Sequence, residues 1–274
     1  MSYYKIDNLE QYFKHYNKSI REPRKFWDKI ASENFTWYQE WEKVIDFDLE
    51  KAKVQWFVGS KVNIVKNCID RHLNRRGDKP AIIFEPNDPK EEAQHITYKD
   101  LHVRVSKMAN VLLEQGIVKG DRVCIYLPMI PELAVATLAC ARIGAIHSVV
   151  FAGFSSSAIA ARINDSECKM VITSDGGYRR NKTIDLKGMM DEALNTCPSV
   201  ENVLVVKRTN SNVNMKEGRD QWLEPLLDEA SDNNVAQIMD AEDPLFILYT
   251  SGSTGKPKGM VHTTAGYMVY SAYT

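Results

Sequence analysis

The sequence predicts an α/β fold with mostly parallel sheets and helices on both faces. Two observations support this class. From about residue 63 onward, short apolar runs alternate with longer segments whose apolar residues recur every three or four positions. The chain also has 274 residues, 44% of them hydrophobic, which is enough for a large core. Strands that alternate with helices need crossover connections, so their sheet runs parallel and is covered on both sides.

The first 62 residues depart from this alternating pattern. Four of the five tryptophans precede Phe57, among many other aromatic and charged residues. Pro23 favours the first turn of a helix whose apolar face would carry Phe26, Trp27 and Ile30. We interpret residues 1–62 as an extension that packs onto a larger domain, residues 63–274, which we expect to be truncated at its C-terminus.

Periodicity and end signals predict the elements of the larger domain. Proline opens the helix predicted over 131–143 and Gly144 follows it, while Gly116 stops another helix and serines cap a third. The predicted helices span 64–73, 98–115, 131–143, 155–163 and 186–194, and a further helix starts after His262. The predicted strands span 81–84, 123–127, 146–151, 169–173, 203–206 and 245–249. Polar, turn-forming loops are predicted over 85–92, 209–219 and 231–234.

Composition and charge exclude several classes of protein. Thirty-five basic residues face 36 acidic ones, so the net charge of −1 gives no bulk attraction to nucleic acid or to a membrane. The N-terminus has no signal pattern, and the longest apolar stretch, 133–141, is far shorter than the roughly 20 residues that span a bilayer. We therefore expect a cytoplasmic protein without nucleic-acid or membrane partners.

The five cysteines predict neither a disulfide framework nor a zinc site. Their number is odd and no two form a C-x-x-C pair. Several stand within apolar or helical runs, which is typical of reduced thiols in a core. We accordingly assign no metal-ligating residues in this chain.

The stretch 249–259 is the clearest functional motif. It follows an apolar strand and contains three glycines, two lysines and the four hydroxyls of Thr250, Ser251, Ser253 and Thr254. Glycines let backbone N–H groups approach an anion, hydroxyls donate hydrogen bonds and lysines supply positive charge. The motif therefore predicts a loop that holds a polyphosphate.

Two common nucleotide motifs do not fit this loop. A Walker A loop needs four residues between its glycines and a hydroxyl after its lysine, whereas two residues separate Gly252 from Gly255, and Pro257 follows Lys256. The three-glycine dinucleotide fingerprint is also absent. The alternative to a phosphate-binding loop is a surface loop that is rich in glycine, serine and lysine and binds no ligand.

The string T-S-G-S-T-G-K-P-K-G over 250–259 resembles the signature of the adenylate-forming superfamily, which includes acyl-CoA synthetases, luciferases and peptide synthetase adenylation domains. Segments elsewhere resemble the acetyl-CoA synthetase branch in one colinear order from about residue 10. The segments that carry this likeness are 56–63, 67–73, 120–132, 139–145, 147–154 and 172–179. After the loop, 262–266 departs from that family's H-T-T-G-G by carrying Ala265 at the fourth position.

The resemblance implies two ligand-binding segments. The loop would close over the β- and γ-phosphates of ATP through its hydroxyls, backbone and lysines, and which lysine contacts phosphate stays open. Its residues are Thr250, Ser251, Gly252, Ser253, Thr254, Gly255, Lys256, Lys258 and Gly259. The basic stretch Arg179, Arg180, Asn181 and Lys182 would contact the phosphates of coenzyme A, and Lys182 stands where relatives carry a second arginine. Without the resemblance, a solvated basic turn is the favoured interpretation of this stretch, and Arg142 and His147 are interpreted as packing or hydrogen-bonding residues.

The resemblance also implies an activity. Such enzymes join acetate to ATP, giving acetyl-adenylate and pyrophosphate, and then pass the acetyl group to coenzyme A. Their magnesium ligands, ribose-binding aspartate and catalytic lysine match no position up to Thr274, so the catalytic residues are unassigned. We expect this chain to carry the phosphate loop and part of the coenzyme A site, without turnover alone. Two alternatives are a non-catalytic, nucleotide-binding remnant of a truncated gene and a ligase for propionate or another short acid, and the oligomeric state is open.

Overall fold

The computed structural model describes residues 6–180, 182–251 and 255–274. Contacts divide the chain into two compact units. The first unit comprises residues 1–71, 238–244 and 262–274, and the second comprises 72–237 and 245–261. The predicted domain division at residues 62 and 63 stays a prediction.

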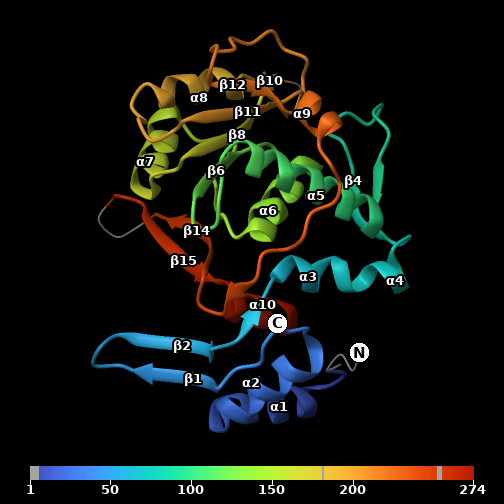
Figure 1. Cartoon of the computed structure of the whole chain (residues 1–274), viewed down its shortest axis with the longest axis vertical. Helices are drawn as coiled ribbons and strands as arrows, with labels where there is room; N and C mark the ends of the chain where they lie inside the picture. The colour runs from blue at the N-terminus through green and yellow to red at the C-terminus, as the bar shows by residue number, and fades with distance from the viewer. Residues whose placement is uncertain (1–5, 181, 252–254) are drawn as a thin grey trace. The chain divides into compact units, whose positions relative to one another are not determined.

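The first unit combines short helices with small antiparallel strand pairs (Figure 1). Its elements are α1 (Leu9–Arg21), α2 (Pro23–Asn34), β1 (Lys43–Asp48), β2 (Lys53–Val58), β3 (Lys61–Val62), α3 (Ile64–Cys68), β13 (Met239–Asp240) and α10 (Thr264–Tyr273). Helix α2 starts at Pro23 as predicted and buries Phe26 and Ile30. Phe26 packs edge to face on Trp27 with ring centroids 5.1 Å apart, so the aromatic residues of the extension form part of this unit's core.

The prediction of one continuous helix over 64–73 is wrong, because the observed helix is interrupted. Helix α3 ends before Ile69, where the backbone turns to φ −123° and ψ −68°. A single 3₁₀ turn, η1 (Asp70–His72), and the short α4 (Leu73–Arg76) follow. The Ile69 side chain is buried, so tertiary packing overrides the local helical pattern here.

The second unit contains a seven-stranded sheet and its covering helices (Figure 1). Its elements are α4, β4 (Pro80–Phe84), β5 (Gln94–Thr97), α5 (Tyr98–Glu114), β6 (Arg122–Tyr126), α6 (Pro131–Ile143), β7 (Ile146–Val149), α7 (Ser156–Ser166), β8 (Met170–Ser174), β9 (Gly177–Arg179), β10 (Lys182–Ile184), α8 (Leu186–Leu194), β11 (Asn202–Val206), β12 (Asp220–Trp222), α9 (Leu223–Glu229), β14 (Pro244–Thr250) and β15 (Lys258–Thr263). The strand order is β12-β11-β8-β6-β7-β14-β15. Every strand pair from β12 across to β14 is parallel, which confirms the predicted fold class.

Helices cover both faces of this sheet. Helices α7 and α8 bury Ile159, Ile163 and Met190 against alternate residues of β6, β8 and β11, while α5 and α6 pack together on the other face (Figure 1). Strand β6 is buried almost throughout, as expected for a central parallel strand.

Several predicted helix ends are confirmed in atomic detail. The hydroxyl of Thr97 accepts from the backbone N–H of Asp100, whose carboxylate accepts from the N–H of Thr97, so α5 opens with a capping box. Gly144 ends α6 with a left-handed backbone (φ +78°). Ser155 caps α7 by accepting from the N–H of Ala158. No helix in the described ranges is long and apolar enough to cross a membrane.

Candidate functional site

The glycine-rich loop joins β14 to β15. The helix predicted to start after His262 is α10, which begins at Thr264, but the sequence did not predict the strand β15 that separates it from the loop. Because the connection of residues 251–257 is far shorter than the dozen or so residues of a parallel crossover, the two neighbouring strands form an antiparallel hairpin. Gly252, Ser253 and Thr254 lie outside the described residues.

The described part of the loop is open to solvent and positively charged. Thr250, Ser251, Gly255, Lys256 and Lys258 are all exposed. Among the described residues, no carboxylate lies within 4.0 Å of either lysine ammonium. These two charges are therefore free to meet an anionic ligand.

A hydrogen bond and ring contacts to α7 hold the base of the loop. The Tyr249 hydroxyl donates to Asp165 at 2.7 Å, and the Arg162 guanidinium lies 5.5 Å from the Tyr249 ring centroid. Burial, together with the nearby Asp165 carboxylate, raises the pKa of Tyr249, so the phenol keeps the proton that it donates. At Gly259 an added Cβ would lie 3.1 Å from Ile247 and 3.3 Å from the Tyr249 ring, so a glycine suits this close approach.

The basic stretch forms a small hairpin. Strands β9 and β10 pair antiparallel, with Arg179 opposite Lys182. Arg180 adopts a left-handed backbone (φ +55°) at the turn, and Asn181 lies outside the described residues. Arg179, Arg180 and Lys182 are exposed, so three of the predicted coenzyme A contacts share one hairpin.

A pocket of about 560 Å³ lies where strands of the sheet end. It is lined by Phe84, Glu85, Asn87, Leu127, Pro128, Met129, Ile130, Leu133, Val149, Val150, Phe151, Ala152, Tyr178, Arg179, Ile184 and Arg208. Residues 127–130 follow β6, residues 151 and 152 follow β7, and Tyr178 and Arg179 follow β8. The connection from β6 leads to β7 on one side, and the connection from β7 leads back past β6 to β8 on its other side, so successive connections run in opposite directions. In open α/β sheets, ligands bind at such a switch point outside the carboxyl ends of the strands.

Of the predicted coenzyme A residues that the structure describes, only Arg179 lines this pocket. Arg208 lines it too, although sequence reasoning did not single it out. The Arg208 guanidinium lies 5.0 Å from the Tyr178 ring centroid and pairs with Glu91 at 2.9 and 3.4 Å. The only sequence signal was the basic pair Lys207-Arg208 after a buried strand, which is too common to identify a site.

Asp175 fixes the turn that carries Arg208. Its side chain is fully buried and accepts backbone N–H bonds from Gly176, Arg208, Thr209 and Ser211, at 2.7 to 3.2 Å. Successive N–H groups that converge on an anion form a nest, which here compensates a buried carboxylate without any cation.

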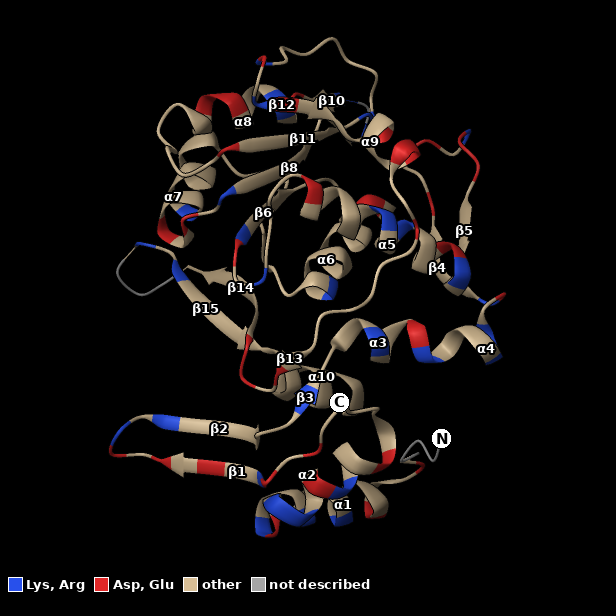
Figure 2. Ribbon diagram, viewed as in Figure 1, with Lys and Arg blue, Asp and Glu red and all other residues tan. Residues whose placement is uncertain are grey.

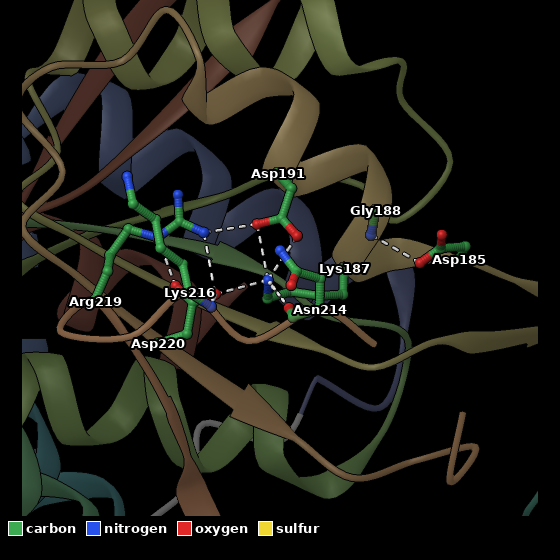
Figure 3. A network of polar contacts seen from close by, with 8 residues as sticks. All are labelled: Asp185, Lys187, Gly188, Asp191, Asn214, Lys216, Arg219 and Asp220. Atoms are coloured by element: carbon green, nitrogen blue, oxygen red, sulfur yellow. Dashed lines mark hydrogen bonds and ion pairs between the residues drawn. The ribbon is translucent and has the colours of Figure 1, made fainter. Parts of the chain in front are cut away.

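A buried ionic network holds the far end of the same loop (Figure 3). The Lys187 ammonium of α8 donates to both oxygens of Asp191 at 2.7 Å, to the Asn214 carbonyl at 2.7 Å and to Asp220 at 2.8 Å. Arg219 bonds both aspartates, at 2.7 Å to Asp191 and 2.5 Å to Asp220. The segment that carries Arg208 is therefore anchored at both ends.

Other charged residues are mixed in sign. Basic and acidic residues are intermixed in both units, as the net charge of −1 suggests (Figure 2). Arg142 is buried and donates to Asn234, as expected of a packing residue. All five cysteines are free thiols, and four of them are buried. Among the described residues, no three His, Cys, Asp or Glu side chains gather as metal ligands.

Comparison with known proteins agrees with the loop and the fold. Residues 69–274 match the family described as AMP-binding enzyme, and residues 12–68 match that described as acetyl-coenzyme A synthetase N-terminus. The chain therefore belongs to the AMP-binding enzyme family. Its first segment places it with the acetyl-coenzyme A synthetases within that family, which confirms the resemblance inferred from the sequence.

Individual relatives give the same assignment. The acetyl-coenzyme A synthetase of Alkalilimnicola ehrlichii is 52% identical over 265 residues, and that of Magnetococcus marinus is 51% identical over 267. Each match covers 97% of this chain and 41% of the relative, so the chain spans about two fifths of their length. The acetoacetyl-CoA synthetase from Streptomyces lividans superposes with a TM-score of 0.84 at 25% identity, over 93% of this chain and 38% of that one.

Proposed function

We propose that the chain contributes the phosphate-binding loop and part of the coenzyme A pocket to an AMP-forming acetate–CoA ligase. The observation that carries this proposal is the T-S-G-S-T-G-K-P-K-G string on the β14–β15 hairpin of a chain that belongs to the AMP-binding enzyme family. The reaction joins acetate to the α-phosphorus of ATP, releases pyrophosphate and then forms acetyl-CoA and AMP.

The loop would act on the leaving pyrophosphate. Attack of a carboxylate oxygen on the α-phosphorus breaks the bond to the bridging oxygen, and negative charge grows on the departing group. Lys256 and Lys258 have no described carboxylate partner, so their charge is available to stabilise that group. The hydroxyls of Thr250 and Ser251 supply further hydrogen bonds to phosphate oxygens.

The pocket at the strand ends would hold the nucleotide end of coenzyme A. Arg179 supplies a guanidinium, which suits two-point contact with phosphate. Apolar residues of the wall, such as Leu127 and Phe151, offer surface for an adenine ring. About 560 Å³ lies within the range of roughly 300 to 1,000 Å³ typical of small-molecule sites.

Magnesium would accompany the ATP phosphates. The loop presents hydroxyl and ammonium groups, whereas Mg²⁺ prefers carboxylate and phosphate oxygens. The resemblance implies that its protein ligands lie outside this chain, and the loop's own residues would bind phosphate oxygens.

Direct binding of ATP tests the role of the loop. In calorimetric titrations, Lys256→Ala or Lys258→Ala should weaken ATP binding roughly tenfold, because each removes a charge-assisted contact. Lys18→Ala, which removes a positive charge from exposed α1, is the matched control and should bind as the wild type does. Wild-type affinity in both loop variants would contradict the proposal.

Turnover is a separate question. We expect the 274-residue chain to show no ATP–pyrophosphate exchange with acetate, since the resemblance places the catalytic lysine and ribose anchor outside it. A clear exchange signal from the purified chain would contradict this expectation. Exchange with propionate instead would favour a ligase for another short-chain acid, and a stop codon directly after codon 274 of the gene would favour a non-catalytic remnant.

A further inference from the structure

Arg208 has the surroundings of a ligand-binding arginine. Its guanidinium lies 5.0 Å from the Tyr178 ring centroid and 5.9 Å from that of Phe84, and all three residues line the pocket at the strand ends. Its side chain is 18% exposed. The aromatic contacts restrict the guanidinium plane, which reduces the entropy lost when it binds an anion.

The backbone beneath Arg208 is rigidly held. The buried Asp175 carboxylate receives the N–H groups of Arg208, Thr209 and Ser211, and the Lys187 network fixes the other end of the loop. These hydrogen bonds fix the backbone from which the Arg208 side chain reaches the pocket.

The Arg208 guanidinium already has an anionic partner, which comes from the acidic loop 85–92. Glu91 pairs with its two terminal nitrogens at 2.9 and 3.4 Å. The loop 85–92 also lines the pocket through Glu85 and Asn87, and Asn87 donates to the Arg180 carbonyl at 3.0 Å. Glu91 is 37% exposed, so its ion pair with Arg208 is only weakly stabilising.

We propose that Arg208 is a further phosphate-binding residue of this pocket and that Glu91 occupies it as an internal anion until a ligand phosphate takes its place. The proposal rests on the proposed coenzyme A function. A two-point arginine–carboxylate pair has the same fork geometry as an arginine–phosphate pair, so one anion can replace the other. A phosphate dianion carries more charge than the carboxylate and therefore competes well for the guanidinium.

The probe is adenosine 3′,5′-bisphosphate, the nucleotide end of coenzyme A, titrated calorimetrically into the full chain. Arg208→Gln should bind it roughly tenfold more weakly, because a charged contact is lost. Glu91→Gln should bind it roughly threefold more tightly, because the competing anion is gone. Glu91→Gln combined with Arg208→Gln should match Arg208→Gln alone, because Glu91 acts only through that guanidinium.

Matched variants separate this proposal from general effects. Glu92→Gln makes the same charge change on the same loop and should leave binding unchanged. Arg208→Lys keeps the charge but loses the fork, so its affinity should fall between wild type and Arg208→Gln. Thermal unfolding of each variant checks that the fold is retained.

The outcomes distinguish three failures. If the wild type binds the probe, Arg179→Gln weakens binding and Arg208→Gln does not, then only the role of Arg208 is overturned. If Glu91→Gln tightens binding equally in the Arg208→Gln background, the displacement by phosphate is overturned. If the wild type does not bind the probe at all, the coenzyme A function and this inference fail together.

Discussion

Two buried aspartates of this chain are stabilised in opposite ways. Asp175 is compensated by backbone N–H groups alone, whereas Asp220 lies between Lys187 and Arg219. Both carboxylates stabilise the loop that carries Arg208, and neither is exposed to a ligand. The ionic network around Asp220 predicts specific responses to mutation and to pH.

Removal of Lys187 should be strongly destabilising. Lys187→Met leaves Asp191 and Asp220 with Arg219 as their remaining cation in a buried network, and we expect the free energy of unfolding to fall by about 3 kcal/mol. Urea unfolding followed by circular dichroism measures this loss. The exposed Lys51→Met should change stability by less than about 0.5 kcal/mol, and equal losses in both variants would contradict the role of the network.

Acid should weaken the same network. Burial by itself would raise the pKa of Asp220, but hydrogen bonds from Arg219 and Lys187 outweigh it and hold that pKa below its usual range. The stabilisation is therefore fully present above the unfolded-state pKa of about 3.9 and is lost as pH falls through the lower folded-state value. Urea unfolding between pH 7 and pH 3 should show a steeper loss of stability in the wild type than in Asp220→Asn. Parallel pH profiles would contradict this assignment.

At the scale of elements, helix ends and tight turns determine where the functional side chains stand. Thr97 opens α5, and Gly116 follows its end with a left-handed backbone (φ +80°). Ser155 opens α7, whose Asp165 then meets Tyr249 at the base of the glycine-rich loop. The capping residues thus set where these helices begin or end, and thereby where a side chain such as Asp165 contacts the site.

Gly116 offers a clean test of one such end. A Cβ added there would meet no atom within 4 Å, so only backbone strain opposes a side chain. We expect Gly116→Ala to lower the free energy of unfolding by about 1 kcal/mol, and Gly116→Asn to lower it by less, since asparagine visits this conformation more readily. Thermal unfolding compares the two, and an alanine variant as stable as the wild type would contradict the argument.

At the scale of the whole molecule, the strand order creates the pocket. Residues that follow β6, β7 and β8 meet there because these strands run parallel and end at the same edge of the sheet. The pocket therefore exists only when the sheet of the second unit is folded. Ligand binding and stability are then linked.

This linkage predicts a thermal shift. A ligand that binds only the folded chain stabilises it by about 2.7 kcal/mol at 100 times its dissociation constant. Adenosine 3′,5′-bisphosphate should accordingly raise the unfolding temperature of the wild type, and raise that of Arg179→Gln less at the same concentration. An unchanged unfolding temperature at saturating ligand would contradict binding in this pocket.

Much of the fold could be predicted from local pattern. The helices over 131–143 and 186–194 have their predicted bounds, and the strands β6, β7, β8, β11 and β14 of the parallel sheet were located to within a few residues, whereas its edge strand β12 was not predicted. The errors fall where packing decides, as at Ile69, or where strands are short and exposed, as in β15 and the β9–β10 hairpin. Such strands lack an apolar alternation, and pairing partners alone define them.

The sequence by itself determined the alternating helices and strands, their caps and the adenylate-forming signature at 250–259, because each depends on residues close together in the chain. Only the tertiary structure decided that Arg179 and Arg208 share one pocket. It alone joined Arg208 to Glu91, 117 positions away, and to the nest around Asp175. The physical reason is that strand order, and not local periodicity, brings the ends of distant strands together.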